Sequence, residues 1–290
     1  MSCIGAHENM QWMGRFGGQH KGFTWLRNLD YTDIRLMTEP SAIFVSDLHL
    51  GTLYAGADPD RGRKFEEFLR GLSGKSSHLF LLGDIFEFWM EYRHYIPKDH
   101  FGILSALKEL RLSGMQIHYL CGNHDFNLGT FFKEHLEIET HDEPFQLELQ
   151  GKRLLLLHGD GMDVEDKIYP WVRKILHHPF CNWLYSLLHP DLGMKIALGV
   201  GNFSRNHTGN VPRYLDRYEA AAKRLLQESR VDILMHGHVH AGFVKDQPEG
   251  VYVNTGEWLQ KLQYVEMIGG QCFLRNYNDS SSRLIDSSFS

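Results

Sequence analysis

The sequence predicts an α/β fold in which two mixed sheets pack together with helices outside them. Two observations support this prediction. Short apolar runs of strand length recur along the chain, and helical patterns separate the first of them. Polar residues of metal-ligand type directly follow five of these runs, at the strand ends where open α/β sheets place their chemistry. With 290 residues and 42% hydrophobic side chains, the chain can bury a full core as one large domain.

Strands and helices alternate in the first half of the chain. We expect strands at residues 43–45, 79–82 and 117–121, because each run is short and apolar. A helix is expected at residues 63–72, whose apolar side chains fall on one face, and a second at residues 98–112. This order places three strands and two helices before residue 122.

The second half of the chain is expected to begin with strands, turn helical and return to strands. The expected strands lie near residues 145–149, 153–157, 231–235, 242–244, 251–254 and 263–267. A turn at Gln150-Gly151-Lys152 separates the first two of them. Between His158 and Ser229 the pattern is helical, and about residues 163–212 are expected to form a cap over the edge where the polar residues gather.

Seven side chains of metal-ligand type occur in five short blocks. The blocks are Asp47-Leu48-His49, Gly83-Asp84, Gly122-Asn123-His124-Asp125, His158 and Gly237-His238-Val239-His240. Residues two apart on a strand point to the same face, so Asp47 and His49 can hold one ion, and His238 and His240 repeat this spacing. The carboxylate of Asp84 can bridge two cations.

The ligands can be sorted into two half-sites that share one carboxylate. Asp47, His49, Asp84 and His240 would hold one ion, and Asp84, Asn123, His158 and His238 the other. This mixture of carboxylate, amide and imidazole suits Mn²⁺, with Fe²⁺ or Zn²⁺ as alternatives, and argues against a structural cysteine-type zinc site. Two cations about 3.5–4 Å apart can polarise a phosphoryl oxygen and support an in-line displacement. The sequence therefore predicts a two-metal phosphoesterase.

Each block taken alone has a simpler explanation. An Asp-x-His pair can be a helix cap beside a surface histidine, and the Gly-Asn-His-Asp block at residues 122–125 can be an ordinary turn. The Gly-His-Val-His block at residues 237–240 can be a strand-end turn with two solvated imidazoles. The joint order of the blocks, with strands in front and glycines at the turns, favours the metal site.

With all five blocks in this order, the chain resembles the calcineurin-like metallophosphoesterases, whose pattern is D-x-H, GD, GNH[DE], H and GHxH. The resemblance implies a four-layer αββα sandwich of two mixed sheets with a helical cap insertion. It also implies that the seven residues are metal ligands, and that His124 acts with Asp84 and Asn123 in catalysis, beside the leaving group as a general acid or phosphate binder. The alternative for His124 is an imidazole oriented by Asp125. The resemblance assigns no role to His236.

A narrower resemblance covers most of residues 41–260. The run Gly83-Asp84-Ile85-Phe86-Glu87-Phe88-Trp89 is similar to the G-D-x-F-E-x-W run of the UDP-2,3-diacylglucosamine diphosphatases of lipid A biosynthesis, and the ending at residues 254–258 is similar to their closing G-[DE]-W. This resemblance implies cleavage of a UDP-linked, doubly acylated sugar to UMP and 2,3-diacylglucosamine 1-phosphate.

One residue differs from the pattern of the narrower family, so the sequence also allows other activities. His124 stands where the best-known members of the narrower family carry Arg, so another phosphodiester or phosphomonoester of nucleotide type is the alternative substrate. A catalytically inactive scaffold with the same fold is the third hypothesis. It is disfavoured because every ligand position is intact.

Substrate choice is expected to lie in the cap. From Lys167 to Arg224 there are nine Lys or Arg against three Asp or Glu, interleaved with aromatic residues. Amphipathic helices that pack aromatics inward and expose basic residues explain this composition simply. The competing hypothesis is a surface that binds acyl chains and anionic headgroups. Arg205 and Arg213 are the candidate diphosphate or sugar contacts, because Arg binds phosphate bidentately.

Composition limits the remaining functions. The net charge is −6, so nothing indicates a nucleic-acid partner, and no motif implies a protein partner. Four scattered cysteines without a C-x-x-C pair or a secretory sequence are typical of a reducing cytosol. No apolar run approaches the ~20 residues that span a bilayer. We therefore expect a cytoplasmic protein, attached at most to the cytoplasmic face of the inner membrane.

The two ends differ from the rest of the chain. Residues 1–36 are rich in Gly, Met, Trp and Arg without a clear period, and we interpret them as a disordered extension or the product of an upstream start codon. Residues 37–277 are expected to form the catalytic domain, and the Ser- and Asp-rich residues 278–290 a flexible tail.

Overall fold

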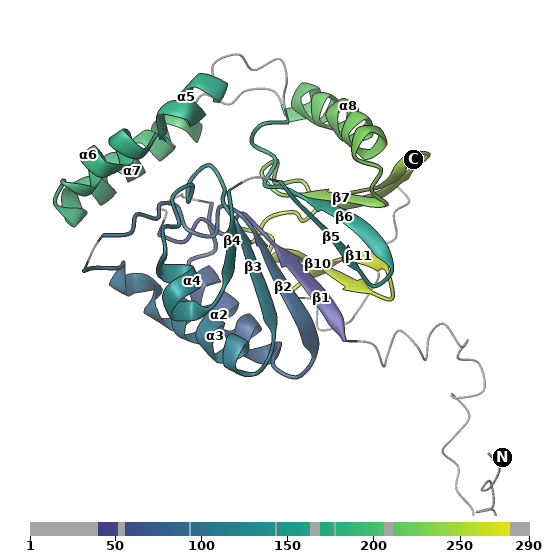
Figure 1. Ribbon diagram of the computed structural model, residues 1–290, viewed down its shortest axis with the longest axis horizontal. Coiled ribbons are helices and arrows are strands. Elements are labelled where there is room, and N and C mark those ends of the chain that lie inside the picture. Colours follow the sequence, from purple (N-terminus) through teal and green to yellow (C-terminus); the bar gives the residue numbers. More distant parts are fainter. Residues whose placement is uncertain are drawn as a thin grey trace, which may run out of the picture. The chain divides into compact units, whose positions relative to one another are not determined.

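The computed structural model describes residues 40–51, 56–92, 94–142, 144–162, 169–176, 178–205 and 211–278. Within these residues the strands form two sheets (Figure 1), with the strand orders β11-β10-β1-β2-β3-β4 and β5-β6-β7-β9-β8. The first sheet contains β11 (Gln271–Asn276), β10 (Gln263–Ile268), β1 (Ser41–Val45), β2 (Ser76–Leu82), β3 (Gln116–Leu120) and β4 (Glu139–His141). The second contains β5 (Phe145–Leu149), β6 (Lys152–Leu156), β7 (Ile233–His236), β9 (Gly250–Asn254) and β8 (Phe243–Gln247).

Both sheets are mixed. Strands β1 to β4 run parallel to one another, and β10 pairs antiparallel with both β1 and β11. In the second sheet β6, β7 and β9 are parallel, while β5 and β8 are antiparallel edge strands. The parallel strands of each sheet therefore bring their carboxyl ends to one edge.

One hydrophobic core lies between the two sheets, and a larger one lies between the first sheet and its helices. On β1, Phe44 packs toward the second sheet and stacks on Phe80 of β2 at 4.7 Å between ring centroids, while Ile43 and Val45 belong to the cluster under the helices. Side chains of β6, β7 and β9 fill the other half of this core. Because β1 is buried on both faces, it reads as a continuous apolar run rather than an alternating one.

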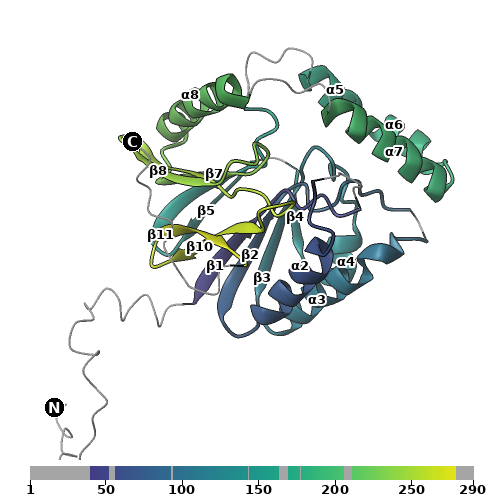
Figure 2. The ribbon, with the colours of Figure 1, turned by 180° about the vertical axis from the view of Figure 1, so that it is seen from behind.

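Helices cover the outer faces of the two sheets (Figures 1 and 2). α2 (Arg61–Gly71), α3 (Phe101–Leu112) and α4 (Phe131–Leu136) pack on the first sheet. α8 (Val211–Ser229) packs on the second through Tyr218, Ala222 and Leu226. The result is the predicted four-layer αββα arrangement, and the predicted α/β fold of two mixed sheets is confirmed.

Three further helices lie in the segment that the sequence assigns to the cap. They are α5 (Tyr169–Leu176), α6 (Pro179–Ser186) and α7 (Pro190–Arg205). The segment contacts the loops at the strand ends, since Arg173 Nε lies 3.5 Å from Asp160 Oδ2 and the rings of Tyr185 and Phe88 are 5.6 Å apart. The cap boundaries stay a prediction, because residues 163–168 and 206–210 are outside the described part of the chain.

Sequence reasoning missed three elements: β4, β11 and α4. Strand β4 is a three-residue edge strand of sequence Glu-Thr-His, too short and polar to show alternation, and α4 has only six residues. The first three residues of the expected second helix, Lys98–His100, form a 3₁₀ turn, and α2 begins two residues earlier than expected. The predictions for residues 1–36 and 279–290 fall outside the described residues.

No helix among the described residues is long and apolar enough to cross a bilayer.

Candidate metal centre

The seven predicted ligands meet where parallel strands of both sheets end. Asp47 and His49 follow β1, Asp84 follows β2, and Asn123 follows β3; His158, His238 and His240 come from the second sheet, after β6 and β7. Their short contacts, described below, show that the structure brings all seven together. The site is therefore assembled from both halves of the sandwich.

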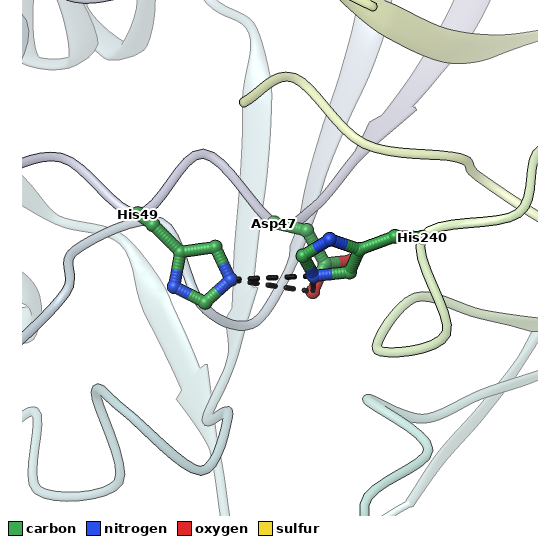
Figure 3. Close-up of side chains that lie close together, drawn as sticks. All are labelled: Asp47, His49 and His240. Atoms are coloured by element: carbon green, nitrogen blue, oxygen red, sulfur yellow. Dashed lines mark hydrogen bonds and ion pairs between the residues drawn. The ribbon is translucent and has the colours of Figure 1, made fainter. Parts of the chain in front are cut away.

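Asp47, His49 and His240 form one group (Figure 3). Oδ1 of Asp47 lies 3.3 Å from Nε2 of His240 and 3.9 Å from Nε2 of His49, and the two imidazole nitrogens are 3.4 Å apart. Figure 3 shows the two rings directing these nitrogens toward the same carboxylate oxygen. One carboxylate oxygen and two imidazole nitrogens thus surround a single point, as ligands of one ion do.

Asp84, Asn123, His158 and His238 form the second group. Nε2 of His158 lies 3.3 Å from Asp84 Oδ2, 3.1 Å from Asn123 Oδ1 and 3.3 Å from His238 Nδ1. The same Oδ2 atom of Asp84 is 3.8 Å from Nε2 of His49 in the first group. Asp84 therefore stands between the groups, in the place of a bridging carboxylate.

Two observations show that these residues fit a pair of cations. Oδ1 of Asp47 is buried and accepts no hydrogen bond, although it faces the nitrogens of the first group. Burial acts to lower the pKa of His158, yet the nearby carboxylates of Asp84 and Asp47 outweigh it and raise that pKa well above its ordinary value. The centre therefore attracts positive charge, which divalent ions would supply.

The backbone at this edge adopts a conformation that side-chain-bearing residues rarely use. Five of the predicted ligands have φ between 48° and 67°: Asp47, His49, Asp84, His238 and His240. Left-handed backbone costs free energy for non-glycine residues and persists where surrounding contacts hold it. Here the N–H groups of Leu48 and His49 both donate to the carbonyl of Asp84, at 2.9 and 3.0 Å, and so tie the two loops together.

Gly83 shows why glycine precedes Asp84. Its φ is +84°, and a Cβ at this position would lie 2.6 Å from Nδ1 of His158 and 2.7 Å from Cα of Gly122. The positive φ disfavours a side chain here, and the clash of a Cβ with these atoms excludes one at this close approach of the two loops.

Asp125 holds the turn that carries Asp84. Its buried carboxylate accepts hydrogen bonds from the backbone N–H groups of Asp84 at 3.0 Å and Ile85 at 2.8 Å, and from the hydroxyl of Tyr119. Asp125 thus fixes the backbone of the turn around Asp84. The alternative in which Asp125 orients the imidazole of His124 is therefore wrong. Five backbone or hydroxyl donors explain why a carboxylate can be fully buried here.

The carboxylate that does face the imidazoles is Glu87, which sequence reasoning gave no role. It is 3% exposed; its Oε2 lies 3.1 Å from Nδ1 of His49, and its Oε1 lies 3.6 Å from Nδ1 of His124. A carboxylate behind a ligand histidine fixes the tautomer and the orientation of the ring. The only signal for Glu87 in the sequence was its place in the run at residues 83–89.

We expect Glu87→Gln to weaken metal binding about 10- to 100-fold, because the amide still fits but no longer fixes His49 electrostatically. Calorimetric titration of the metal-free protein with Mn²⁺ measures the effect. Glu148→Gln, an exposed change on β5, serves as the matched control. Equal Mn²⁺ affinities for Glu87→Gln and the unmodified protein would show that Glu87 does not orient His49 for metal binding.

His124 lies at the edge of the centre. Its ring meets that of His49 edge-on at 4.8 Å, its backbone N–H donates to Oδ1 of Asp84 at 2.9 Å, and its Nδ1 lies 3.2 Å from the carbonyl oxygen of Glu87. His124 is close enough to His49 and Asp84 to share an ion with them. Its catalytic role stays a prediction.

Three further residues were singled out from the sequence: Arg205, Arg213 and His236. The side chains of Arg205 and Arg213 are outside the described part of the structure. His236 is buried between the rings of Tyr218 and Tyr252, and its Nε2 lies 2.8 Å from the hydroxyl of Tyr252. Burial lowers the pKa of His236 to about 3, so at neutral pH it is an uncharged core residue.

A cavity of about 250 Å³ adjoins the second group, because His158 forms part of its wall. Asp160, Arg173 and Arg224 line it together with the carboxyl end of β3 and the residues of α8. Sequence reasoning did not select Arg173 and Arg224 from the nine basic residues of the cap region, since the packing of α5 and α8 decides which of these side chains face the centre. The cavity therefore places both basic and acidic side chains beside the metal centre, with Arg173 paired to Asp160.

Comparison with known proteins agrees with this geometry. Residues 41–242 match the model of the calcineurin-like phosphoesterase family. A UDP-2,3-diacylglucosamine hydrolase of Psychromonas ingrahamii is 30% identical over 78% of this chain and 92% of its own length. One from Photorhabdus laumondii is 32% identical over 71% of this chain and 84% of its own length. Among solved structures, a predicted phosphoesterase from Streptococcus pneumoniae covers 82% of this chain and 90% of its own at 15% identity and a TM-score of 0.41.

Proposed function

The chain belongs to the calcineurin-like phosphoesterase family and is a metal-dependent hydrolase, and we propose that it cleaves the pyrophosphate bond of UDP-2,3-diacylglucosamine. The products would be UMP and 2,3-diacylglucosamine 1-phosphate, as in lipid A biosynthesis. The observation that carries this proposal is the run at residues 83–89. It is similar to a run of the diphosphatases, and its Asp84 and Glu87 both contact His49 of the centre.

Calcineurin-like phosphoesterases bind two divalent metal ions, and the residues described above fit such a pair. We propose Mn²⁺ as the native metal, with Asp47, His49, Asp84 and His240 around one ion and Asp84, Asn123, His158 and His238 around the other. When bound, the two ions supply Lewis acidity at the phosphoryl group and lower the pKa of water.

The remaining steps depend on the side chains beside the ions. Glu87 engages the Nδ1 side of His124, which leaves Nε2 as the nitrogen that can deliver a proton to the leaving oxygen. Asn123, held against His158, would orient a phosphoryl oxygen through its amide. In the cavity, Arg173 and Arg224 offer positive charge for the rest of the diphosphate or for the sugar. We retain Arg205 and Arg213 as proposed substrate contacts.

The acyl chains would bind at the helical cap, about residues 163–212 of the proposed catalytic domain at residues 37–277. Helices α5 to α7 expose an unusual number of large apolar side chains: Trp171 (69%), Ile175, Phe180, Trp183 (56%), Leu184, Leu187, Leu192 and Ile196. Lys174 lies over the ring of Trp171 at 5.2 Å. Exposed aromatic and aliphatic groups beside cations are typical of surfaces that bind lipid, so we also propose attachment to the cytoplasmic face of a membrane.

The function is tested by UMP release from UDP-2,3-diacylglucosamine in Mn²⁺ and mild detergent, with UDP-N-acetylglucosamine as the unacylated comparison. We expect rapid turnover of the acylated substrate alone. Trp183→Ala should raise KM for the acylated substrate, whereas Leu112→Ala, which removes an exposed apolar group from α3, should not. Unchanged KM and kcat for both variants would show that the acyl chains do not bind at the cap.

The replacement of Arg by His124 favours a second candidate, a nucleotide-type phosphodiester or phosphomonoester. Failure to turn over the acylated substrate, with an aryl phosphodiester still cleaved, would keep the metal chemistry and discard the lipid substrate.

A further inference from the structure

A second group of metal-ligand side chains lies at the free edge of the first sheet, and it shares no residue with the centre described above. His118 is on β3, and Glu139 and His141 are on the neighbouring strand β4. In the parallel register His118 lies opposite Glu139 and Leu120 opposite His141. Because Glu139 and His141 are two residues apart on one strand, their side chains point to the face that His118 also occupies.

The separations between the polar atoms match those around a tetrahedral ion. Nδ1 of His118 lies 3.2 Å from Nε2 of His141 and 3.4 Å from Oε2 of Glu139. Ligands about 2.0–2.1 Å from Zn²⁺ in a tetrahedral site are about 3.3–3.4 Å from one another. The two separations from Nδ1 of His118 are therefore those of zinc ligands, and all three ligand atoms lie within 4.8 Å of one another.

Hydrogen bonding within the group accounts less well for this arrangement. The proton on Nδ1 of His118 can point well at only one of its two neighbours, the carboxylate or the second imidazole. A cation at the centre contacts all three groups at once. Aromatic rings also pack against both imidazoles, and the charged groups near them are Arg111, beside His118, and Asp142, beside His141.

The imidazole rings are held in place by stacking. His118 stacks on Phe80 at 5.0 Å with an interplanar angle of 9°, and His141 stacks on Phe145 at 4.0 Å. Burial lowers the pKa of His118 to about 4 and also lowers that of His141. Both rings are therefore neutral at pH 7, which is the protonation state that binds metal.

We propose that His118, Glu139 and His141 form a third metal site, which binds one Zn²⁺ ion at the edge between β3 and β4. Two imidazoles and one carboxylate fill three positions of a tetrahedron and leave the fourth to water. The side chain of Glu139 is 70% exposed, so the site opens to solvent and can load after folding. His141 also lines the cavity beside the dinuclear centre, so the ion would add positive charge next to that wall.

The test is the number of zinc ions bound per chain. The full-length protein is equilibrated with Zn²⁺ and freed of loose metal on a desalting column, and its zinc content is measured by mass spectrometry. We expect Glu139→Gln and His141→Asn each to bind one equivalent less than the unmodified protein, and calorimetry to show at least about a tenfold weaker affinity for the lost equivalent. The zinc content of each variant is compared with that of the unmodified protein. The result therefore does not depend on how many ions occupy the dinuclear centre.

Matched controls separate this site from general surface binding. Glu148→Gln and His135→Asn remove the same kinds of side chain from exposed positions on β5 and α4 and should leave the zinc content unchanged. Glu139→Gln alters a solvent-exposed side chain, so its circular dichroism spectrum should match that of the unmodified protein. Equal zinc content in all five proteins, or an equal loss in the controls, would overturn the proposal.

Discussion

Asp84→Ala is expected to abolish hydrolysis and to release metal, since this one carboxylate faces both half-sites. Its Oδ2 lies 3.3 Å from Nε2 of His158 and 3.8 Å from Nε2 of His49, while its Oδ1 accepts the backbone N–H of His124. Removing it leaves the second group without a carboxylate and the first with only that of Asp47, so much of the negative charge that holds the cations together is lost. We expect kcat to fall at least about a thousandfold, and metal content to fall with it.

Steady-state kinetics and metal analysis on the same preparation measure this prediction. Asp84→Asn separates charge from shape, because the amide fills the same space but carries no charge; it should lose metal almost as completely as alanine. Asp246→Ala, an exposed change on β8, is the matched control and should retain both metal and activity. Full turnover by a chelator-treated protein would contradict the two-metal mechanism altogether.

His124→Gln is expected to lower kcat by about 10²- to 10⁴-fold while both metal ions remain bound, which is the range for loss of a general acid. The imidazole is oriented through Nδ1 by the carbonyl oxygen of Glu87 at 3.2 Å, so its other nitrogen can serve the leaving group. An aryl phosphodiester with a good leaving group needs no proton at that oxygen. It should therefore lose far less rate than the nucleotide-sugar substrate.

The contrast between the two substrates makes this test specific. If His124 were a metal ligand together with His49 and Asp84, the substitution would lower metal content and both rates equally. That outcome would refute the general-acid role. His135→Gln, an exposed histidine on α4, should change neither rate.

Much of the fold could be predicted because its signals are local. The core strands β1, β2 and β6 carry short apolar runs that stand out against their flanks, and each ends at a block with turn residues. The edge strand β4 could not be predicted in this way. β4 is short and half-exposed, so its stability comes from pairing with β3 rather than from a pattern in its own residues.

The site could be predicted only in part. The residue types of the seven candidate ligands, and the two-residue spacing of Asp47 and His49 and of His238 and His240, were visible directly. The roles of Asp125 and Glu87 were not, because the first binds the turn after β2 from the loop after β3 and the second faces His49 from a different loop. Contacts of this kind depend on how loops pack against each other in three dimensions. They leave no pattern in the local sequence from which they could be predicted.

By itself, the sequence determined the kind of ligand available at each strand end. The expectation that Asp47 and His49, and His238 and His240, pair by strand alternation was wrong, because all four follow the strands with left-handed backbone and the two later histidines join different groups. Only the tertiary structure decided that one oxygen of Asp84 stands between two groups from different sheets, and that the register of β3 and β4 sets His118 opposite Glu139. The physical reason is the separation along the chain over which each kind of interaction acts. Periodicity and turn chemistry act over a few residues, whereas these arrangements arise from sheet packing that joins residues as far apart as Asp47 and His240.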